Sequence, residues 1–196
     1  KRVGPLRWSQ SDRPMAHARD RHRPKGRNVK ILVTGTEGYL GSLLAPRLMA
    51  QGHDVVGLDT GYYMTGWFYR GVERSPMTLL KDLRAADAGD LAGVDAVVHM
   101  AELSNDPTGD LRPGITHEIN HLGSIRLAEL AKAAGVQRFV YMSSCSVYGV
   151  AEGEVDERSA VDPQTAYAEC KTLVERDLAP MADDTFSPTF LRNATA

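Results

Sequence analysis

From Val29 onward, short apolar runs alternate with amphipathic stretches. The apolar runs, bounded by turn-forming residues, predict strands at about residues 29–34, 54–58, 78–81, 95–100, 137–142 and 187–191. Between them, apolar residues recur with helical spacing, which predicts helices at about residues 39–51, 86–92, 114–134 and 165–182. Runs that are apolar throughout are typical of strands buried on both faces, and their alternation with helices is typical of a parallel sheet. The pattern predicts an α/β fold of three layers, with helices on both faces of a parallel sheet.

Residues 1–28 lack this pattern and carry most of the positive charge. They hold nine Lys or Arg against Asp12 and Asp20, whereas the whole chain of 196 residues has a formal net charge of -2. Such a stretch could act as an arm for nucleic acid or an acidic membrane. Its three prolines and its lack of apolar period favour a disordered leader or an added extension instead. We therefore expect one domain over residues 29–196 and no nucleic-acid partner.

Composition narrows the class of protein further. The chain is 42% apolar and 24% charged, and no apolar run approaches the roughly 18 residues that a membrane span needs. No apolar segment follows the basic leader, which argues against a secretory signal. Cys145 and Cys170 stand apart from each other and from any histidine cluster, so neither a zinc site nor a disulfide framework is expected. We expect a soluble cytoplasmic protein without a bound metal or a membrane partner.

The segment from Thr60 to Met77 is long for a strand-to-helix connection and has no clear period. It could wall a pocket or a partner surface, or it could simply pack as a long loop. Its aromatic residues are Tyr62, Tyr63, Trp67, Phe68 and Tyr69.

A glycine-rich turn directly follows the first predicted strand and opens the first predicted helix. Its sequence from Thr34 is T-G-T-E-G-Y-L-G. The first glycine permits a tight turn, the second lets the backbone approach a pyrophosphate, and the third lets helix and strand pack closely. Free N–H groups at the helix start then hold phosphate. The pattern predicts a dinucleotide site formed by Gly35, Gly38, Tyr39, Leu40 and Gly41.

An acidic residue, Asp59, ends the second predicted strand, 18 residues beyond Gly41. A carboxylate in this place can accept both ribose hydroxyls of the cofactor and repels a 2′-phosphate. The alternative is an aspartate that only begins a turn. The first interpretation favours NAD over NADP.

A second motif lies where the fifth predicted strand ends and the fourth predicted helix begins. Ser144 stands near the strand end, and Tyr167 and Lys171 are four residues apart, on one face of a helix. A nearby ammonium stabilises phenolate, which makes the tyrosine a general base. The same spacing also occurs on solvated helices that have no such role. The hydroxyl in the same sheet and the dinucleotide turn favour an active site.

These residues resemble the extended short-chain dehydrogenase/reductases, specifically the NAD-dependent nucleotide-sugar epimerase/dehydratase group, over roughly residues 29–196. The resemblance implies a doubly wound Rossmann-type αβα sandwich with NAD as cofactor. It implies that Tyr167 is the catalytic acid/base, that Lys171 is its partner and binds the nicotinamide ribose, and that Ser144 orients the substrate. It further implies cofactor contacts at Asp82, Leu83, Met100, Ala101, Glu102 and Asn120, the last in a helix where it supports the active-site end.

The sequence departs from the family pattern at several positions. Cys145 and Ser146 stand where the family's 4,6-dehydratases carry an Asp-Glu pair, and neither supplies a carboxylic acid, so dehydration is disfavoured. Glu102 stands where a second alanine is usual, and Thr195 where an asparagine is usual. Family members continue into a C-terminal domain that grips the nucleotide sugar. We therefore expect the sequence to belong to a longer protein.

The function implied by the resemblance is transient oxidation of a sugar hydroxyl in a nucleotide-sugar epimerase. A nucleotide-sugar reductase or dehydratase with the same triad is an alternative, and so is a silent module that only senses dinucleotide. The resemblance also implies a homodimer. We expect it to pair the helices at 114–134 and 165–182 through exposed apolar positions such as Leu127 and Leu173.

Overall fold

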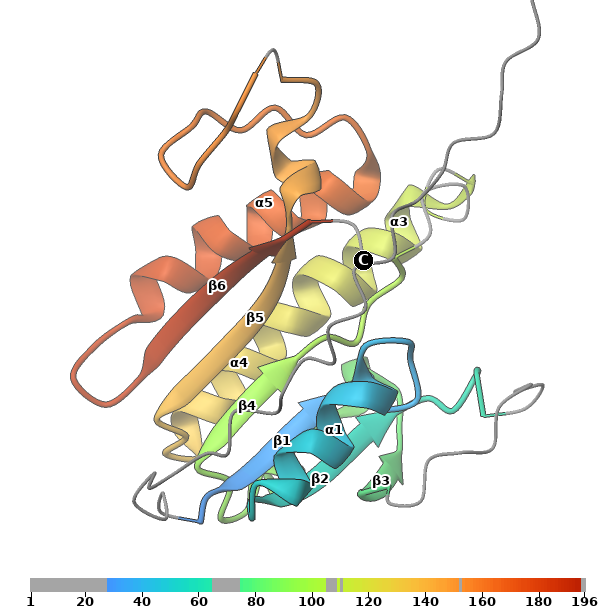
Figure 1. Cartoon of the computed structure of the whole chain (residues 1–196), viewed down its shortest axis with the longest axis vertical. Helices are drawn as coiled ribbons and strands as arrows, with labels where there is room; N and C mark the ends of the chain where they lie inside the picture. The colour runs from blue at the N-terminus through green and yellow to red at the C-terminus, as the bar shows by residue number, and fades with distance from the viewer. Residues whose placement is uncertain (1–27, 65–74, 105–108, 110, 152, 195–196) are drawn as a thin grey trace, which may run out of the picture.

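A computed structural model describes residues 28–64, 75–104, 109, 111–151 and 153–194 (Figure 1). The expectations for the leader, except Asn28, concern residues outside this range. Three aromatic residues of the long connection, Trp67, Phe68 and Tyr69, also lie outside it. So does Thr195, which stands where the family usually has an asparagine.

Six strands form one parallel sheet, as the alternating pattern predicts. They are β1 (Lys30–Thr34), β2 (Asp54–Asp59), β3 (Met77–Leu80), β4 (Ala96–His99), β5 (Arg138–Ser144) and β6 (Ser187–Asn193). Their order across the sheet is β3-β2-β1-β4-β5-β6, and every pairing is parallel. The direction of winding therefore reverses between β1 and β4. In doubly wound sheets a ligand binds at the carboxyl ends of the strands beside this switch point.

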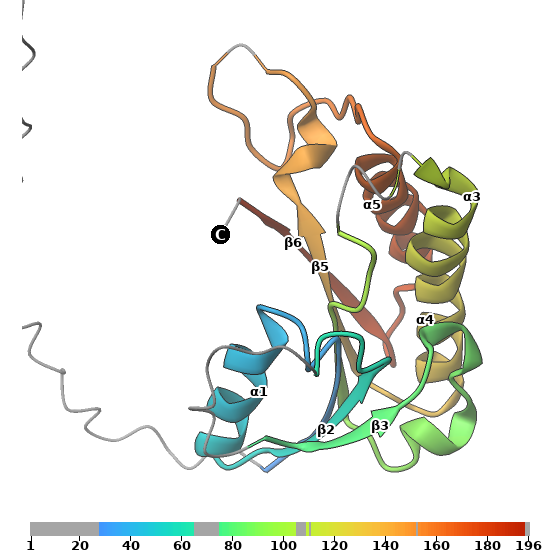
Figure 2. The same cartoon turned by 90° about the vertical axis from the view of Figure 1, so that its right-hand side faces the viewer.

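The helices cover the two faces of the sheet unequally (Figure 2). Helix α1 (Gly41–Ala50) lies on one face. The opposite face carries α3 (Pro113–Thr116), the π-helical segment η3 (His117–Gly123), α4 (Ser124–Ala133) and α5 (Ala166–Leu178). Short 3-10 turns lie at η4 (Cys145–Tyr148) and η5 (Ala179–Met181). The Rossmann-type αβα fold is thus confirmed.

Two stretches differ from the predicted helices. The helix expected at 86–92 is replaced by two 3-10 turns, η1 (Leu83–Ala85) and η2 (Ala88–Leu91). The side chains of Asp82 and Asp87 each cap one of these turns, so each turn starts independently and neither extends into a helix. The predicted helix at 114–134 is interrupted by the π-helical segment, which apolar spacing does not reveal.

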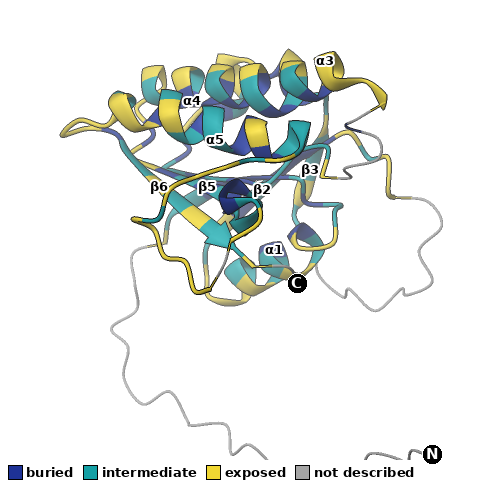
Figure 3. Ribbon diagram, turned by 90° about the horizontal axis from the view of Figure 1, so that it is seen from above, coloured by how far each residue is buried: buried dark blue, intermediate teal, exposed yellow. Residues whose placement is uncertain are grey.

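The larger hydrophobic core lies between the sheet and the helices α4 and α5, where buried residues gather (Figure 3). Leu127 points into this core and is 0% exposed. The expectation that Leu127 is an exposed dimer contact is therefore wrong, because it sits on the sheet-facing side of α4. Leu173 on α5 is only half-buried.

Within the described ranges, no helix is long and apolar enough to cross a membrane. The same ranges hold no group of three or more His, Cys, Asp or Glu side chains placed to bind a metal ion.

Candidate active site

A cavity of about 1170 Å³ opens at the carboxyl ends of the central strands. It joins the two motifs that are far apart in the sequence. Of the site residues expected from the sequence, those on its wall are Gly35, Gly38, Tyr39, Leu40, Gly41, Asp59, Asp82, Leu83, Met100, Ala101, Glu102, Ser144, Tyr167 and Lys171. Tyr62 and Tyr63 from the long connection also line it, which supports the pocket interpretation for that segment.

The glycine turn is packed too closely for side chains at two positions. Gly35 has a φ of 77° and donates its N–H to Leu58 O at 2.8 Å, which ties the turn to β2. A Cβ on Gly41 would lie 2.0 Å from Gly35 O, and a Cβ on Gly35 would lie 3.0 Å from Ala101 N. The turn therefore fits tightly between the neighbouring strand ends and presents its backbone to the cavity. This cradle fits a pyrophosphate at the start of α1.

Asp59 makes a turn and also lines the cavity. Its Oδ1 accepts the N–H of Gly61 at 2.8 Å, and its Oδ2 accepts the N–H of Glu37 at 3.0 Å. Each oxygen keeps a second lone pair, which is what a ribose diol needs. The Glu37 carboxylate, which the sequence analysis did not single out, accepts the Thr78 hydroxyl at 3.2 Å on the same wall. Two carboxylates at this end make it unfavourable for a 2′-phosphate.

Asp82 is on the wall, but its carboxylate is already engaged by Arg84. Its Oδ1 accepts the backbone N–H of Arg84 at 2.8 Å, and its Oδ2 accepts the guanidinium at 2.9 Å. The Arg84 guanidinium accordingly lowers the pKa of Asp82. Leu83 next to it is buried. Asp82 and Leu83 together form the part of the cavity wall that follows β3.

Beneath the cavity, a buried chain of hydrogen bonds joins β1, β4 and η3. Thr34 Oγ1 accepts the backbone N–H groups of Met100 at 3.0 Å and Ala101 at 3.1 Å, so its hydroxyl proton is directed to His99 Nδ1 at 2.7 Å. His99 Nε2 is then the protonated nitrogen and donates to Ser124 Oγ, also at 2.7 Å. Burial lowers the pKa of His99 to about 3, so the ring is neutral.

Asn120 belongs to this support and not to the cavity wall. It is 0% exposed, its Oδ1 accepts the N–H of Leu103 at 2.8 Å, and its Nδ2 donates to Leu103 O at 2.9 Å. Ser124 Oγ in turn donates to Asn120 O at 2.6 Å. The resemblance implies a direct cofactor contact for Asn120. In this structure its side chain instead holds the segment after β4 through the two hydrogen bonds to Leu103.

Helix α5 presents Tyr167 and Lys171 to the cavity. The helix begins after Thr165, whose hydroxyl accepts the N–H of Ala168 at 3.2 Å and so fixes the first turn. Lys171 is 3% exposed, and its Nζ lies 5.2 Å from the Tyr167 ring centroid. The ammonium also donates to Met142 O of β5. The two side chains therefore share one face, beside the end of β5.

Ser144 begins the η4 turn at the end of β5. Its Oγ accepts the N–H of Ser146 at 3.1 Å, and Ser146 also lies on the cavity wall. Cys170 on α5 is buried, and burial raises the pKa of its thiol to about 12. That thiol is therefore no nucleophile at neutral pH.

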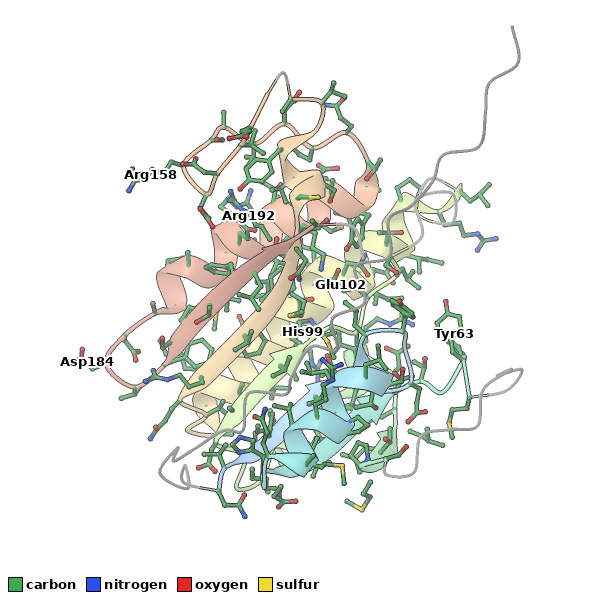
Figure 4. All side chains as sticks on the ribbon, viewed as in Figure 1. Tyr63, His99, Glu102, Arg158, Asp184 and Arg192 are labelled. Atoms are coloured by element: carbon green, nitrogen blue, oxygen red, sulfur yellow. The ribbon has the colours of Figure 1, made fainter. Side chains whose placement is uncertain are left out.

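Glu102 pairs with the expected catalytic lysine. Its side chain is 2% exposed, and its Oε2 lies 2.6 Å from Lys171 Nζ. Its Oε1 accepts the hydroxyl of Tyr141 at 2.6 Å. Figure 4 shows Glu102 and His99 near the middle of the molecule, whereas Tyr63 lies toward its edge. Burial raises the pKa of Glu102, and the Lys171 ammonium opposes that rise.

A second, partly buried ion pair holds the last strand in place. Arg192 on β6 donates to Glu175 Oε2 of α5 at 2.7 Å and to Tyr148 Oη at 3.0 Å. Ser143 Oγ donates to Glu175 Oε1 at 2.5 Å. These bonds hold α5, β5 and β6 together behind Ser144. The sequence alone does not reveal these bonds, because they join residues between 17 and 44 positions apart.

Comparison with known proteins shows the family to which this chain is similar. Residues 31–196 match the model of the NAD dependent epimerase/dehydratase family. The chain is 34% identical over 155 residues to a UDP-glucose 4-epimerase of Mycolicibacterium smegmatis, which covers 75% of this chain and 49% of that protein.

Solved structures agree with the sequence comparison. A UDP-glucose-4-epimerase from Stenotrophomonas maltophila with bound NAD and formylated UDP-arabinopyranose superposes with a TM-score of 0.75 at 30% identity, over 84% of this chain and 52% of that chain. The NAD dependent NDP-hexosamine 5,6-dehydratase TunA, from tunicamycin biosynthesis, gives a TM-score of 0.76 at 27% identity, over 84% and 54%. The chain spans about half the length of the relatives that it matches. It belongs to the NAD dependent epimerase/dehydratase family.

Proposed function

We propose that this chain forms the cofactor-binding part of an NAD-dependent nucleotide-sugar epimerase. One observation carries the proposal: Asp59 at one end and Ser144, Tyr167 and Lys171 at the other line a single cavity. Similarity to UDP-glucose 4-epimerases, one of them solved with NAD, supports the choice of cofactor and substrate class.

The described residues fit NAD along the whole cavity. The amides of the glycine turn and the start of α1 would hold the pyrophosphate, and Asp59 would hold the adenosine ribose. Lys171 would hold the nicotinamide ribose at the other end. When bound, NAD accepts a hydride from a sugar carbon and later returns it.

The chain's own residues manage the proton. Oxidation of an alcohol releases a proton, which a base must accept within hydrogen-bond reach. Tyr167 is that base, and its phenol returns the proton when the ketone is reduced again. Ser144, fixed by the Ser146 N–H, orients the same sugar oxygen. Lys171 lies beside the phenol and stabilises its charged form.

Epimerisation fits the site better than dehydration. Elimination of water from a sugar needs an additional acid and base beside the reacting carbons. Cys145 and Ser146 follow Ser144, and neither is a carboxylic acid. Ser146 Oγ is buried and has no hydrogen-bond partner among the described residues.

We also propose a homodimer formed by the outer faces of η3, α4 and α5. Leu122 on η3 is 58% exposed there and replaces Leu127 as the apolar contact. The bond from His121 Nε2 to Asp177 Oδ2, at 2.7 Å, holds η3 and α5 together beneath this surface.

The first experiment asks which dinucleotide the chain binds. We expect the purified chain to bind NAD more tightly than NADP, and Asp59→Ala to weaken NAD by at least about tenfold, because two ribose hydrogen bonds are lost. Asp54→Ala is the matched control, since Asp54 is exposed at the opposite end of β2. Tighter binding of NADP, or unchanged NAD affinity in Asp59→Ala, would overturn the assignment.

The second experiment distinguishes the possible activities. A protein spanning the full length of the relatives should convert a nucleotide sugar into its epimer without net consumption of NAD. Release of a 4-keto-6-deoxy sugar would identify a dehydratase, and stoichiometric oxidation of NADH a reductase. NAD binding without any turnover would identify a sensing module.

A further inference from the structure

Glu102 is a buried carboxylate that the proposed mechanism does not use. It follows the end of β4 at the same end of the cavity as Tyr167 and Lys171. Both of its oxygens face donors, the Lys171 ammonium and the Tyr141 hydroxyl, each at 2.6 Å. These two donors favour the ionised carboxylate and oppose the rise in its pKa that burial causes.

The surroundings isolate this ion pair from other charges. His99 on β4 is neutral, because burial lowers its pKa to about 3. Burial raises the pKa of Tyr141 on β5 well above its ordinary value, and that of Cys170 on α5 to about 12. Glu169 lies on the exposed side of α5, where its Oε2 is 3.5 Å from His117 Nε2. Glu102 and Lys171 therefore set the local charge.

The ammonium is enclosed on several sides. Besides Glu102, it contacts Met142 O, and it lies 4.6 Å from the Tyr141 ring centroid and 5.2 Å from that of Tyr167. Without the carboxylate, one uncompensated positive charge would face this end of the cavity. The oxidised nicotinamide ring is itself positively charged, whereas the reduced ring is neutral. An uncompensated ammonium would therefore disfavour the oxidised form.

We propose that Glu102 is a positioning residue that holds the Lys171 ammonium in place and offsets its charge, so that the site favours oxidised over reduced dinucleotide. The inference rests on the proposed function, because it assumes that the cavity binds NAD. It deepens that function by giving the site a preference between the two redox states.

The test measures the ratio of the dissociation constants for NADH and NAD. The proteins are wild type, Glu102→Gln, Glu102→Gln with Lys171→Met, and Glu169→Gln, all at the same pH. NADH is followed by its fluorescence and NAD by calorimetry. A purely structural defect weakens both forms alike and leaves the ratio unchanged.

We expect Glu102→Gln to shift the ratio about tenfold toward NADH, because the uncompensated ammonium would repel the positively charged oxidised ring and not the neutral reduced ring. The double variant, which lacks both charges, should return toward the wild-type ratio. Glu169→Gln removes an exposed carboxylate from the same helix and should change the ratio less than twofold. An unchanged ratio in Glu102→Gln, or an equal shift in Glu169→Gln, would overturn the proposal.

Unfolding in denaturant tests the ion pair without any cofactor. Lys171→Met alone leaves Glu102 buried without its partner, so at pH 8 this variant should unfold at lower denaturant concentration than the double variant. Equal midpoints would show that the two side chains do not form the pair. If wild type binds neither dinucleotide, the proposed function and the redox preference both fail, whereas the unfolding comparison still decides the pairing.

Discussion

At the scale of single residues, the reacting end of the cavity is a small set of side chains with separate tasks. Tyr167 lies on the cavity wall, the Lys171 ammonium lies beside its ring, and Ser144 is fixed by a backbone N–H. Each can be altered without removing a large apolar side chain from the core. Substitutions of Tyr167 and Ser144 should therefore separate chemistry from folding, whereas Lys171 is also paired with the buried Glu102.

Tyr167→Phe removes only one hydroxyl. In a protein spanning the full length of the relatives, we expect turnover to fall by roughly 10²- to 10⁴-fold, the usual contribution of a positioned acid/base group. NAD affinity and the unfolding midpoint should stay close to wild type, which serves as the internal control. Wild-type turnover across neutral pH in this variant would mean that another group is the base.

His99 should stay uncharged over the whole physiological range. Its pKa is about 3 in the folded chain, against an ordinary value of 6.5, because it is buried. Between these values the unfolded chain binds the extra proton, so as the pH falls below 6.5, the free energy of unfolding should decrease by up to about 1.4 kcal/mol per pH unit. We expect the His99 ring signals in NMR to show no titration between pH 8 and 5. A midpoint near 6.5 would contradict the buried neutral ring.

Asp59 could be predicted from the sequence because its place depends only on the end of one strand. The pairing of Glu102 with Lys171 and Tyr141 could not be predicted, because Glu102 lies 39 positions from Tyr141 and 69 from Lys171, and the three meet only when β4, β5 and α5 pack. The sequence gives one indication of this pairing: Glu102 stands where the family usually has an alanine. It marked an unusual position but did not indicate the partner.

At the scale of elements, the dinucleotide turn depends on close packing between backbones. Gly41→Ala would place a Cβ 2.0 Å from Gly35 O, which the turn cannot accommodate without moving. We expect NAD affinity to fall at least about tenfold and the free energy of unfolding to fall by about 1–3 kcal/mol.

Gly114→Ala in α3 is the matched control, since nothing lies within 4 Å of its Cβ. There the substitution should keep NAD affinity and stabilise the helix by up to about 1 kcal/mol. Equal NAD affinity in the two variants would mean that the turn is not the phosphate site.

Strand positions were predictable because buried parallel strands are apolar along their whole length. The local turns were less predictable, because capping aspartate side chains determine where each turn begins. Asp82 and Asp87 start two separate 3-10 turns where spacing alone predicted one helix. Apolar spacing does not distinguish the π-helical segment η3 from an α-helix, and this segment contains Asn120, whose side chain clamps Leu103.

At the scale of the whole molecule, the described helices gather on one face of the sheet, leaving α1 on the other (Figure 3). The outer side of η3, α4 and α5 is then the surface through which we propose that two copies meet. Leu127 shows why helical spacing alone could not identify this surface. The same apolar period serves the core side and the outer side of a helix, and Leu127 faces the core.

Leu122→Glu should convert the expected dimer into a monomer. It would place a charge at the centre of the proposed contact, at a residue that is 58% exposed, so the monomer should keep its fold. Sedimentation at micromolar concentration measures the mass. The control is Met77→Glu, which should remain dimeric. Met77 is 69% exposed and lies on β3, the edge strand at the other end of the sheet from β6. A wild-type chain that sediments only as a monomer would contradict the proposed pairing.

The chain of hydrogen bonds from Thr34 through His99 to Ser124 has a single direction, since each member donates to the next and the last donates to Asn120 O. This direction restricts how the positions can evolve. A replacement that reverses one member would leave two donors, or two acceptors, facing each other in the interior. Serine at 34 and threonine at 124 preserve the order of donors. Most other replacements at one of these positions need a compensating replacement at another. Related sequences should therefore change at these positions in concert, even though 90 residues separate the first from the last.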